Sequence, residues 1–291
     1  MHPLARRDHD AEPLRHPDPD RDALSAIGPV PRLVATDLDG TLLRSDGTVS
    51  ARTAGVLAAL ERRGVPVVFV TGRPARWMEV VRQHVGGHGL AICSNGAVVL
   101  RLADDAVELV RPLPEDEGAA VVRDLRAALP DVRFAIESVE GFGMEPDYPA
   151  VQPAPAGSPV EAIDRLLRRR PVKLMARHPA LDPDAFLGVV DEVVAGRAVA
   201  TRSGATAMVE LSAAGVTKAS TLELLCGRFG VTAEEVVAFG DMPNDLPMLA
   251  WAGRSFAVGD AHPALAAVVT DRAGSNDEDG VAVALEAIFG L

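Results

Sequence analysis

The most informative segment of the chain is LVATDLDGT, residues 33–41. The apolar run that opens it predicts a buried strand, and the Asp39-Gly40 pair predicts a turn directly after that strand. Asp37 and Asp39 would then lie together where the strand ends, beside the backbone N–H groups of Leu38 and Gly40, which can bind an anion. The structural alternative is an ordinary β-turn that Asp39 merely suits.

The same arrangement recurs along the chain. Apolar runs of strand length alternate with stretches of helical periodicity, which is typical of a parallel sheet covered on both faces. The predicted strands are residues 33–36, 67–70, 90–93, 236–239 and 255–258, and the predicted helices are 51–63, 219–229 and 241–250. We therefore expect an α/β fold with a doubly wound, mostly parallel, Rossmann-like sheet. Ligands of such sheets bind at the carboxyl ends of the strands.

The middle of the chain has a different sequence pattern, in which short apolar segments are separated by Pro/Gly loops. Its predicted strands are residues 133–136, 172–176 and 198–201, and its predicted helices are 115–129 and 160–169. Only 34 residues separate Asp37 from Thr71, so an inserted domain does not fit there and must follow the third strand. The predicted organisation is a disordered tail (1–30), a catalytic core (31–112 and 209–291) and an inserted α+β cap domain (113–208).

Composition excludes several classes of protein. The chain has 291 residues, 48% of them hydrophobic, and its longest apolar runs are far too short to cross a bilayer. A net charge of −12 argues against nucleic acid or a membrane as partner. Two cysteines favour a reducing, cytoplasmic compartment. Only Lys173 and Lys218 are lysines among 29 basic residues, so a lysine here is expected to serve its own chemistry.

A second acidic motif, GDMPND at residues 240–245, also follows an apolar strand directly. Asp241, Asn244 and Asp245 supply oxygen ligands of the kind that a hard divalent cation prefers. The structural alternative is that Asp241 or Asn244 caps the helix that follows.

Two further segments offer phosphate contacts. Thr71, Gly72 and Arg73 follow the second predicted strand, where a hydroxyl and nearby N–H groups can bind phosphate. The alternative is a turn threonine and a surface arginine. Lys218 stands at the start of a predicted helix, where a cation opposes the helix dipole, so we expect a carboxylate and a phosphoryl oxygen to hold it. The alternative is a surface lysine.

Together these segments resemble the haloacid dehalogenase superfamily of phosphotransferases. The motifs are Asp-Leu-Asp-Gly-Thr at 37–41, Val-Thr-Gly-Arg at 70–73, Lys218, and Gly-Asp-x-x-Asn-Asp at 240–245, in the family's order. Ser94-Asn95-Gly96-Ala97 and the late insertion are similar to the Cof-like subgroup, type IIB with a C2 cap. The sequence departs from the subgroup at Ala219, where glycine is usual, and at residues 258–261, where Asp260 leaves the outer metal shell and nearby substrate contacts uncertain.

The resemblance implies a role for each site residue. Asp37 would attack phosphorus, and Asp39 would act as general acid and then base, which requires it to begin protonated. Mg²⁺ would be held by the Asp37 carboxylate, the Asp39 carbonyl and the Asp241 carboxylate. Lys218 and Thr71 would contact the phosphoryl oxygens, and Gly72, Leu38 and Gly40 would also bind phosphate. Asn244 and Asp245 would support the metal from its outer shell or add a further ligand. Arg73 and Asn95 would face the substrate.

The expected function is Mg²⁺-dependent hydrolysis of a small cytosolic phosphomonoester, a sugar phosphate or related metabolite, through an aspartyl-phosphate. A phosphomutase using the same half-reaction and a non-catalytic phosphometabolite-binding protein remain as alternatives. A receiver-type signalling domain is disfavoured because Asp37 and Lys218 are 181 residues apart. Residues 141–148 form either a loop that reaches the substrate or a plain surface hairpin. The oligomeric state is not predicted.

Overall fold

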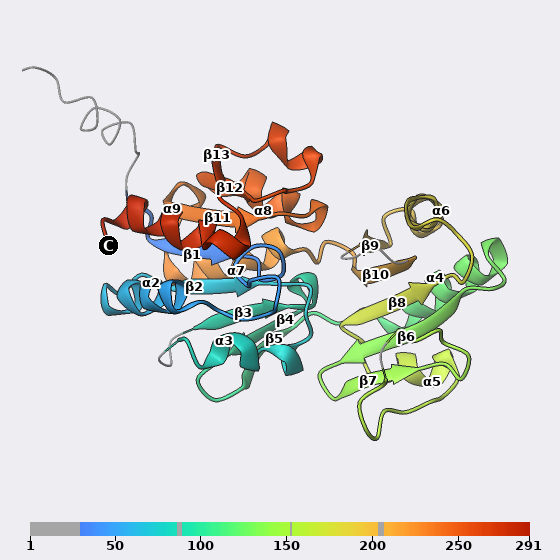
Figure 1. Cartoon of the computed structure of the whole chain (residues 1–291). Coiled ribbons are helices and arrows are strands. Elements are labelled where there is room, and N and C mark those ends of the chain that lie inside the picture. Colours follow the sequence, from blue (N-terminus) through green and yellow to red (C-terminus); the bar gives the residue numbers. More distant parts are fainter. Residues whose placement is uncertain (1–29, 86–88, 152, 203–206) are drawn as a thin grey trace, which may run out of the picture. The chain divides into compact units, whose positions relative to one another are not determined.

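The first predicted strand forms β1 (Leu33–Thr36) and lies inside an eight-stranded sheet (Figure 1). The computed structural model describes residues 30–85, 89–151, 153–202 and 207–291. The strand order is β13-β12-β11-β1-β2-β3-β4-β5. The other strands of this sheet are β2 (Val67–Val70), β3 (Leu90–Cys93), β4 (Val98–Arg101), β5 (Ala106–Val110), β11 (Val236–Gly240), β12 (Arg254–Val258) and β13 (Asp271–Ala273).

All neighbouring strands from β13 to β3 pair in parallel, whereas β4 and β5 are antiparallel. Counted along the chain, the six parallel strands stand in the Rossmann order 3-2-1-4-5-6. The mostly parallel α/β sheet is thereby confirmed. Successive strands after β1 are added on one side of it (β2, β3), and the later strands β11 to β13 lie on its other side, so the strand order reverses between β1 and β11. Thr36 pairs with Phe239 at that point. That switch point is where such sheets open a crevice.

Helices cover both faces of this sheet. Val34 packs on the side of α2 (Ala51–Arg62) and α9 (Gly280–Phe289), while Leu33 and Ala35 pack on the side of α7 (Lys218–Phe229) and α8 (Leu246–Trp251). Each fully buried aliphatic side chain contributes about 1.5–3 kcal/mol through removal from water. The doubly wound arrangement is therefore as predicted. The short α3 (Glu79–Arg82) follows β2.

A second sheet of five strands has the order β7-β6-β8-β10-β9, and all its pairs are antiparallel. Its strands are β6 (Arg133–Ser138), β7 (Gly141–Met144), β8 (Lys173–Arg177), β9 (Ala198–Thr201) and β10 (Met208–Ala213). Its helices are α4 (Glu115–Ala128), α5 (Ile163–Leu167) and α6 (Pro183–Val194). Phe134, Ile136 and Leu174 are buried in one cluster with residues of these helices. Alternation sends Ala135, Glu137 and Lys173 to the opposite face.

Several predicted elements differ from the observed ones. The helix expected at 160–169 shortens to α5, because Val160 forms a β-bridge with Met144. The helix expected from residue 241 begins regularly only at Leu246, because the backbone N–H groups of Asp241 and Met242 bond to the Asp245 side chain instead. Strands β4, β5, β7, β10 and β13 are not among the predicted ones.

The second sheet follows the third strand only after the β4–β5 hairpin has joined the first sheet. Residues 31–291 form one compact unit, and the boundaries predicted at 112 and 208 stay a prediction. The predicted tail, residues 1–30, lies outside the described residues except for Val30. Among the described residues, no helix is both long and apolar enough to span a membrane.

Candidate active site

A cavity of about 760 Å³ lies at the carboxyl edge of the first sheet. Asp37, Asp39, Arg73 and Asn244 line it from this sheet, and the second sheet contributes further side chains. Its size falls within the range of about 300–1,000 Å³ that is typical of small-molecule sites.

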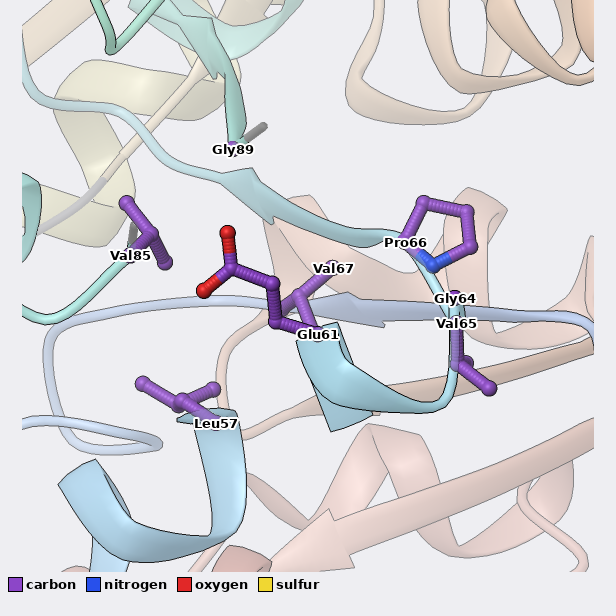
Figure 2. Close-up of a pocket in the computed structure, with 8 residues that line it drawn as sticks. All are labelled: Leu57, Glu61, Gly64, Val65, Pro66, Val67, Val85 and Gly89. Atoms are coloured by element: carbon purple, nitrogen blue, oxygen red, sulfur yellow. The ribbon is translucent and has the colours of Figure 1, made fainter. Parts of the chain in front are cut away.

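A smaller cavity, of about 250 Å³, lies at the opposite edge, where residues 64–67 lead into β2 and Gly89 leads into β3. Figure 2 shows that its lining is apolar except for Glu61. The groups that carry acid–base or metal chemistry therefore gather in the larger cavity.

Three carboxylates meet at the switch point of the sheet. Ligand oxygens of Asp37, Asp241 and Asp245 all lie within 4.8 Å of one another. Asp37 follows β1 directly, and the other two follow β11, its parallel neighbour. The two acidic motifs predicted from the sequence are thus brought together by one strand pair.

Lys218 connects two of these carboxylates. Its Nζ donates to Asp37 Oδ1 and to Asp245 Oδ1, both at 2.7 Å, and its side chain is 1% exposed. Thr217 caps α7 by accepting the N–H of Ser220, which fixes the first turn of the helix from which Lys218 projects. Burial alone would lower the pKa of the ammonium, but Asp245 and Asp37 outweigh it, so the pKa is raised and the group stays charged.

The cluster carries more negative than positive charge. Burial raises the pKa of Asp37 well above its usual range, although Lys218 opposes the shift. Burial also raises the pKa of Asp241 to about 6, while a hydrogen bond from Thr41 lowers it. A further positive charge at this point would stabilise both carboxylates.

Close backbone approach shapes the cluster. Gly40 has φ +78°, and a Cβ there would lie 2.4 Å from Asp241 Oδ2. A Cβ on Gly240 would lie 2.6 Å from the Cβ of Asp245. Glycine at position 40 therefore lets the two acidic motifs touch, and glycine at position 240 lets the second motif fold back on itself.

The donor set fits a hard cation. Carboxylate oxygens of Asp37 and Asp241 are close, and Thr41 Oγ1 orients Asp241 by donating to its Oδ1 at 2.7 Å. Within the described part of the chain, Asn244 Oδ1 is buried without a hydrogen-bond partner. A buried amide oxygen beside carboxylates is a ligand of the kind that Mg²⁺ prefers.

Asp39 lies apart from the cluster. Its carboxylate accepts two hydrogen bonds from Arg73, at 2.7 Å from Nε and 2.5 Å from Nη2. The Asp39 side chain is 59% exposed and lines the cavity. In this pairing Asp39 is an acceptor, in contrast to the protonated start expected for a general acid.

The remaining predicted residues form the walls of the site. Thr71 is buried, and its Oγ1 accepts the N–H of Arg73 at 3.0 Å, so in this structure the hydroxyl holds its own turn. Gly72 lines the cavity, whereas the Leu38 side chain is buried in the core. Asn95 has φ +55° and accepts a hydrogen bond from Asn244 Nδ2 at 3.2 Å.

Sequence reasoning did not identify four side chains at this site. Thr41 holds Asp241, and Glu137, Lys173 and Glu210 reach the cavity from the second sheet. Lys173 Nζ donates to Glu210 Oε1 at 2.6 Å and to the Gly72 carbonyl at 2.7 Å. The rarity of lysine was the available signal for Lys173, whereas the two glutamates have no local signature.

The loop at 141–148 contains a hairpin strand and also lines the cavity, and its contact with a substrate stays a prediction. Residues 141–144 pair with β6 as a hairpin strand. Phe142 and Tyr148 nevertheless line the cavity that contains Asp37.

Comparison with known proteins agrees with this geometry. Residues 34–285 match the family model for haloacid dehalogenase-like hydrolases. The chain is 29% identical over 276 residues to the 5-amino-6-(5-phospho-D-ribitylamino)uracil phosphatase YitU of Bacillus subtilis, covering 90% of this chain and 98% of that protein. It is 30% identical over 244 residues to the HMP-PP phosphatase of Cronobacter sakazakii, covering 81% and 87%.

Among solved structures, BT1666 of Bacteroides thetaiotaomicron, a phosphatase of the haloalkanoate (HAD) superfamily, is similar with a TM-score of 0.77 and 26% identity, covering 91% of this chain and 99% of that one. The family model covers nearly all of the described fold, and the named relatives are phosphatases. The chain therefore belongs to the haloacid dehalogenase-like hydrolase family, as a phosphatase of its Cof-like branch.

Proposed function

We propose that this phosphatase is a Mg²⁺-dependent phosphomonoester hydrolase that forms an aspartyl-phosphate on Asp37. The observation that carries the proposal is the 2.7 Å contact of Lys218 Nζ with Asp37 Oδ1 inside a cluster of three carboxylates. Asp37, one member of this cluster, lines a cavity large enough for a metabolite.

The reaction has two displacements at phosphorus. In the first, an Asp37 oxygen bonds to phosphorus, the bond from phosphorus to the leaving oxygen breaks, and that oxygen takes a proton from Asp39. In the second, water attacks phosphorus and gives a proton to Asp39, and the bond between phosphorus and Asp37 breaks. The products are an alcohol and inorganic phosphate, and both aspartates return to their starting states.

Lys218 supplies fixed positive charge during both displacements. It lowers the pKa of Asp37 against the effect of burial, which favours the ionised, nucleophilic form, and it neutralises charge on the phosphoryl oxygens as the bonds change. Asp245 holds the ammonium in place by accepting at 2.7 Å. Its second oxygen is occupied by the N–H groups of Asp241 and Met242, which makes Asp245 a positioning residue.

Asp37, Asp241 and the oxygens of Asp39 and Asn244 would hold Mg²⁺, which supplies charge neutralisation for the dianionic substrate. Asp39 must also leave its pairing with Arg73 and take up a proton from solvent before it can give one to the leaving oxygen. A phosphoryl dianion entering the cavity competes for Arg73, and loss of that ion pair releases Asp39 for acid–base work.

The substrate is a small phosphorylated metabolite, a sugar phosphate or a related ester. Two relatives are named for a phosphoribitylamino-uracil and for HMP-PP, which supports a compact organic phosphate as the class. Residues 113–208 would act as a cap that excludes water and contacts the leaving group. The buried free thiols of Cys93 and Cys226 support a reducing, cytoplasmic setting.

The test is phosphate release from a panel of metabolite phosphomonoesters and from the acyl phosphate acetyl phosphate, measured with Mg²⁺ and with excess chelator. We expect turnover only with Mg²⁺, with Asp37→Asn as the blank, and acid-stable trapping of phosphate on the wild-type chain alone. A folded wild-type chain that hydrolyses no ester in the panel, or one that is equally active in chelator, contradicts the proposal.

A further inference from the structure

The face of the second sheet opposite its helices carries charged and apolar side chains side by side. Glu137 pairs with Lys173 in the β6–β8 register, and Glu210 on β10 pairs with Met175. Phe142, opposite Glu137 on β7, belongs with Tyr148, Met175 and Met208 to a small apolar cluster that is separate from the two main cores. We call Phe142, Tyr148, Met175 and Met208 the cap-face patch.

The cap-face patch and the catalytic aspartate line one cavity. Phe142, Tyr148, Met175 and Met208 appear in its wall together with Asp37. A substrate whose phosphorus is in reach of Asp37 therefore extends its leaving group toward this patch.

The charged side chains on this face already bond to other protein groups. Glu210 accepts from Lys173 at 2.6 Å and from Asn95 Nδ2 at 2.9 Å. Glu137 accepts from Arg76 at 2.8 Å. Because these side chains satisfy one another, they offer few free hydrogen-bond partners to the hydroxyl groups of a polyol.

The cap-face patch offers π faces and thioethers. Methionine sulfur packs favourably on aromatic rings, and Phe or Tyr rings stack with other flat rings. A bare polyol would lose water at this patch without replacing its hydrogen bonds. The patch therefore favours a flat ring over a polyhydroxylated chain.

One polar group at the patch still has donor capacity. The Arg177 guanidinium lies 5.9 Å from the Tyr148 ring centroid, and its Nη2 contacts Met208 Sδ at 3.6 Å. Arg177 Nε is buried and has no hydrogen-bond partner among the residues that the structure describes. A ring nitrogen or ring carbonyl oxygen would be a matching acceptor.

We propose that the preferred substrates are phosphomonoesters whose leaving group carries a heteroaromatic ring, stacked on the cap-face patch with an acceptor toward Arg177. This inference rests on the proposed hydrolase function and specifies its substrate class. The reaction itself is unchanged, so the alcohol product keeps the ring and inorganic phosphate is released.

The experiment compares kcat/KM of the full chain with Mg²⁺ for two ring esters, pyridoxal 5′-phosphate and flavin mononucleotide, and for two polyol esters, glucose 6-phosphate and sorbitol 6-phosphate. Acetyl phosphate, which carries neither group, is the reference. We expect the better ring ester to exceed both polyol esters about 10-fold, mainly through KM, because 10-fold corresponds to about 1.4 kcal/mol of binding, which a stacked aromatic pair can supply.

Variants of the cap-face patch test whether the preference for ring esters arises there. Met175→Ala and Tyr148→Ala should lower kcat/KM for the ring ester about 10-fold more than for acetyl phosphate. Met144→Ala is the matched control, because Met144 packs in the same apolar cluster but does not line the cavity. It should leave the ratio of ring ester to acetyl phosphate within about two-fold of wild type.

The outcomes separate the two levels of the argument. Hydrolysis of acetyl phosphate with no preference for ring esters, or patch variants that lower all esters equally, overturns this inference and leaves the hydrolase function standing. A folded chain that turns over no ester at all overturns both.

Discussion

Two groups of buried charges, one at each sheet, differ in their balance. At the first sheet, the three carboxylates of Asp37, Asp241 and Asp245 lie together with one ammonium, that of Lys218, which contacts Asp37 and Asp245. At the second sheet, each carboxyl group has a cation of its own: Glu137 pairs with Arg76, and Glu210 pairs with Lys173. The unbalanced group is the place where we propose that a cation and a phosphate bind, and we expect the balanced group to hold the two sheets together.

The two lysines allow this comparison to be tested with the same substitution. Lys218→Met removes the fixed charge beside the proposed nucleophile, and we expect kcat to fall about 1,000-fold or more. The measurement is phosphate release with Mg²⁺, with circular dichroism to confirm folding. If the variant fails to fold, Lys218→Arg provides the same test. If either Lys218 variant folds and keeps kcat within 10-fold of wild type, the catalytic role of Lys218 is contradicted.

Lys173→Met should act on stability more than on chemistry. It leaves the 6%-exposed side chain of Glu210 without its cation, which costs about 3 kcal/mol in the free energy of unfolding. We expect urea denaturation to show this loss, and addition of Glu210→Gln to recover part of it. An unchanged free energy of unfolding in Lys173→Met would mean that the Lys173–Glu210 pair does not hold the two sheets together.

The charges at the second sheet also depend on pH, because Glu137 titrates near neutrality. Burial raises its pKa from the ordinary 4.5 to about 7, although Arg76 and Lys173 lower it. A raised carboxyl pKa gives stability that is complete below pH 4.5 and lost as pH rises through 7. Across that window wild type should lose roughly 3 kcal/mol relative to Glu137→Gln. Parallel stability profiles for the two proteins would show that Glu137 titrates normally.

Mg²⁺ should raise the free energy of unfolding only by binding at the first-sheet group of Asp37, Asp241 and Asp245. At ten times its dissociation constant the ion adds about 1.4 kcal/mol, which raises Tm by roughly 3–6 °C in a chain of this size. Asp241→Asn should reduce this rise, while Glu210→Gln should preserve it. An equal rise in Tm for wild type and Asp241→Asn would place the ion elsewhere.

The parts of the fold predicted from sequence are those with a strong local pattern. The strands β1, β2 and β3 appear at the predicted residues because centrally placed parallel strands are continuous apolar runs. β4 was missed because it follows β3 after only the short turn Ser94–Gly96, which leaves no room for a crossover helix and forces an antiparallel return. β10 contains Glu210, a charge that interrupts the apolar pattern.

The site residues that could be predicted are those that directly follow a predicted strand or begin a predicted helix. Asp37, Asp241, Asp245 and Lys218 were expected to meet, and the structure brings them together. The partner of Lys173 was not predictable, because an ion pair between residues 173 and 210 depends on the register of two antiparallel strands. The Asp39–Arg73 pair likewise depends on how two separate loops lie at the sheet edge.

The burial of both lysines gives the folded chain unusual behaviour toward amine-directed reagents. Lys173 and Lys218 are the chain's two lysines, and each is at most 3% exposed. Acylating labels and cross-linkers should therefore leave the side chains of the closed protein unmodified. Modification of Lys173 by such a label would report, without background from other lysines, each moment at which the second sheet lifts away from the first.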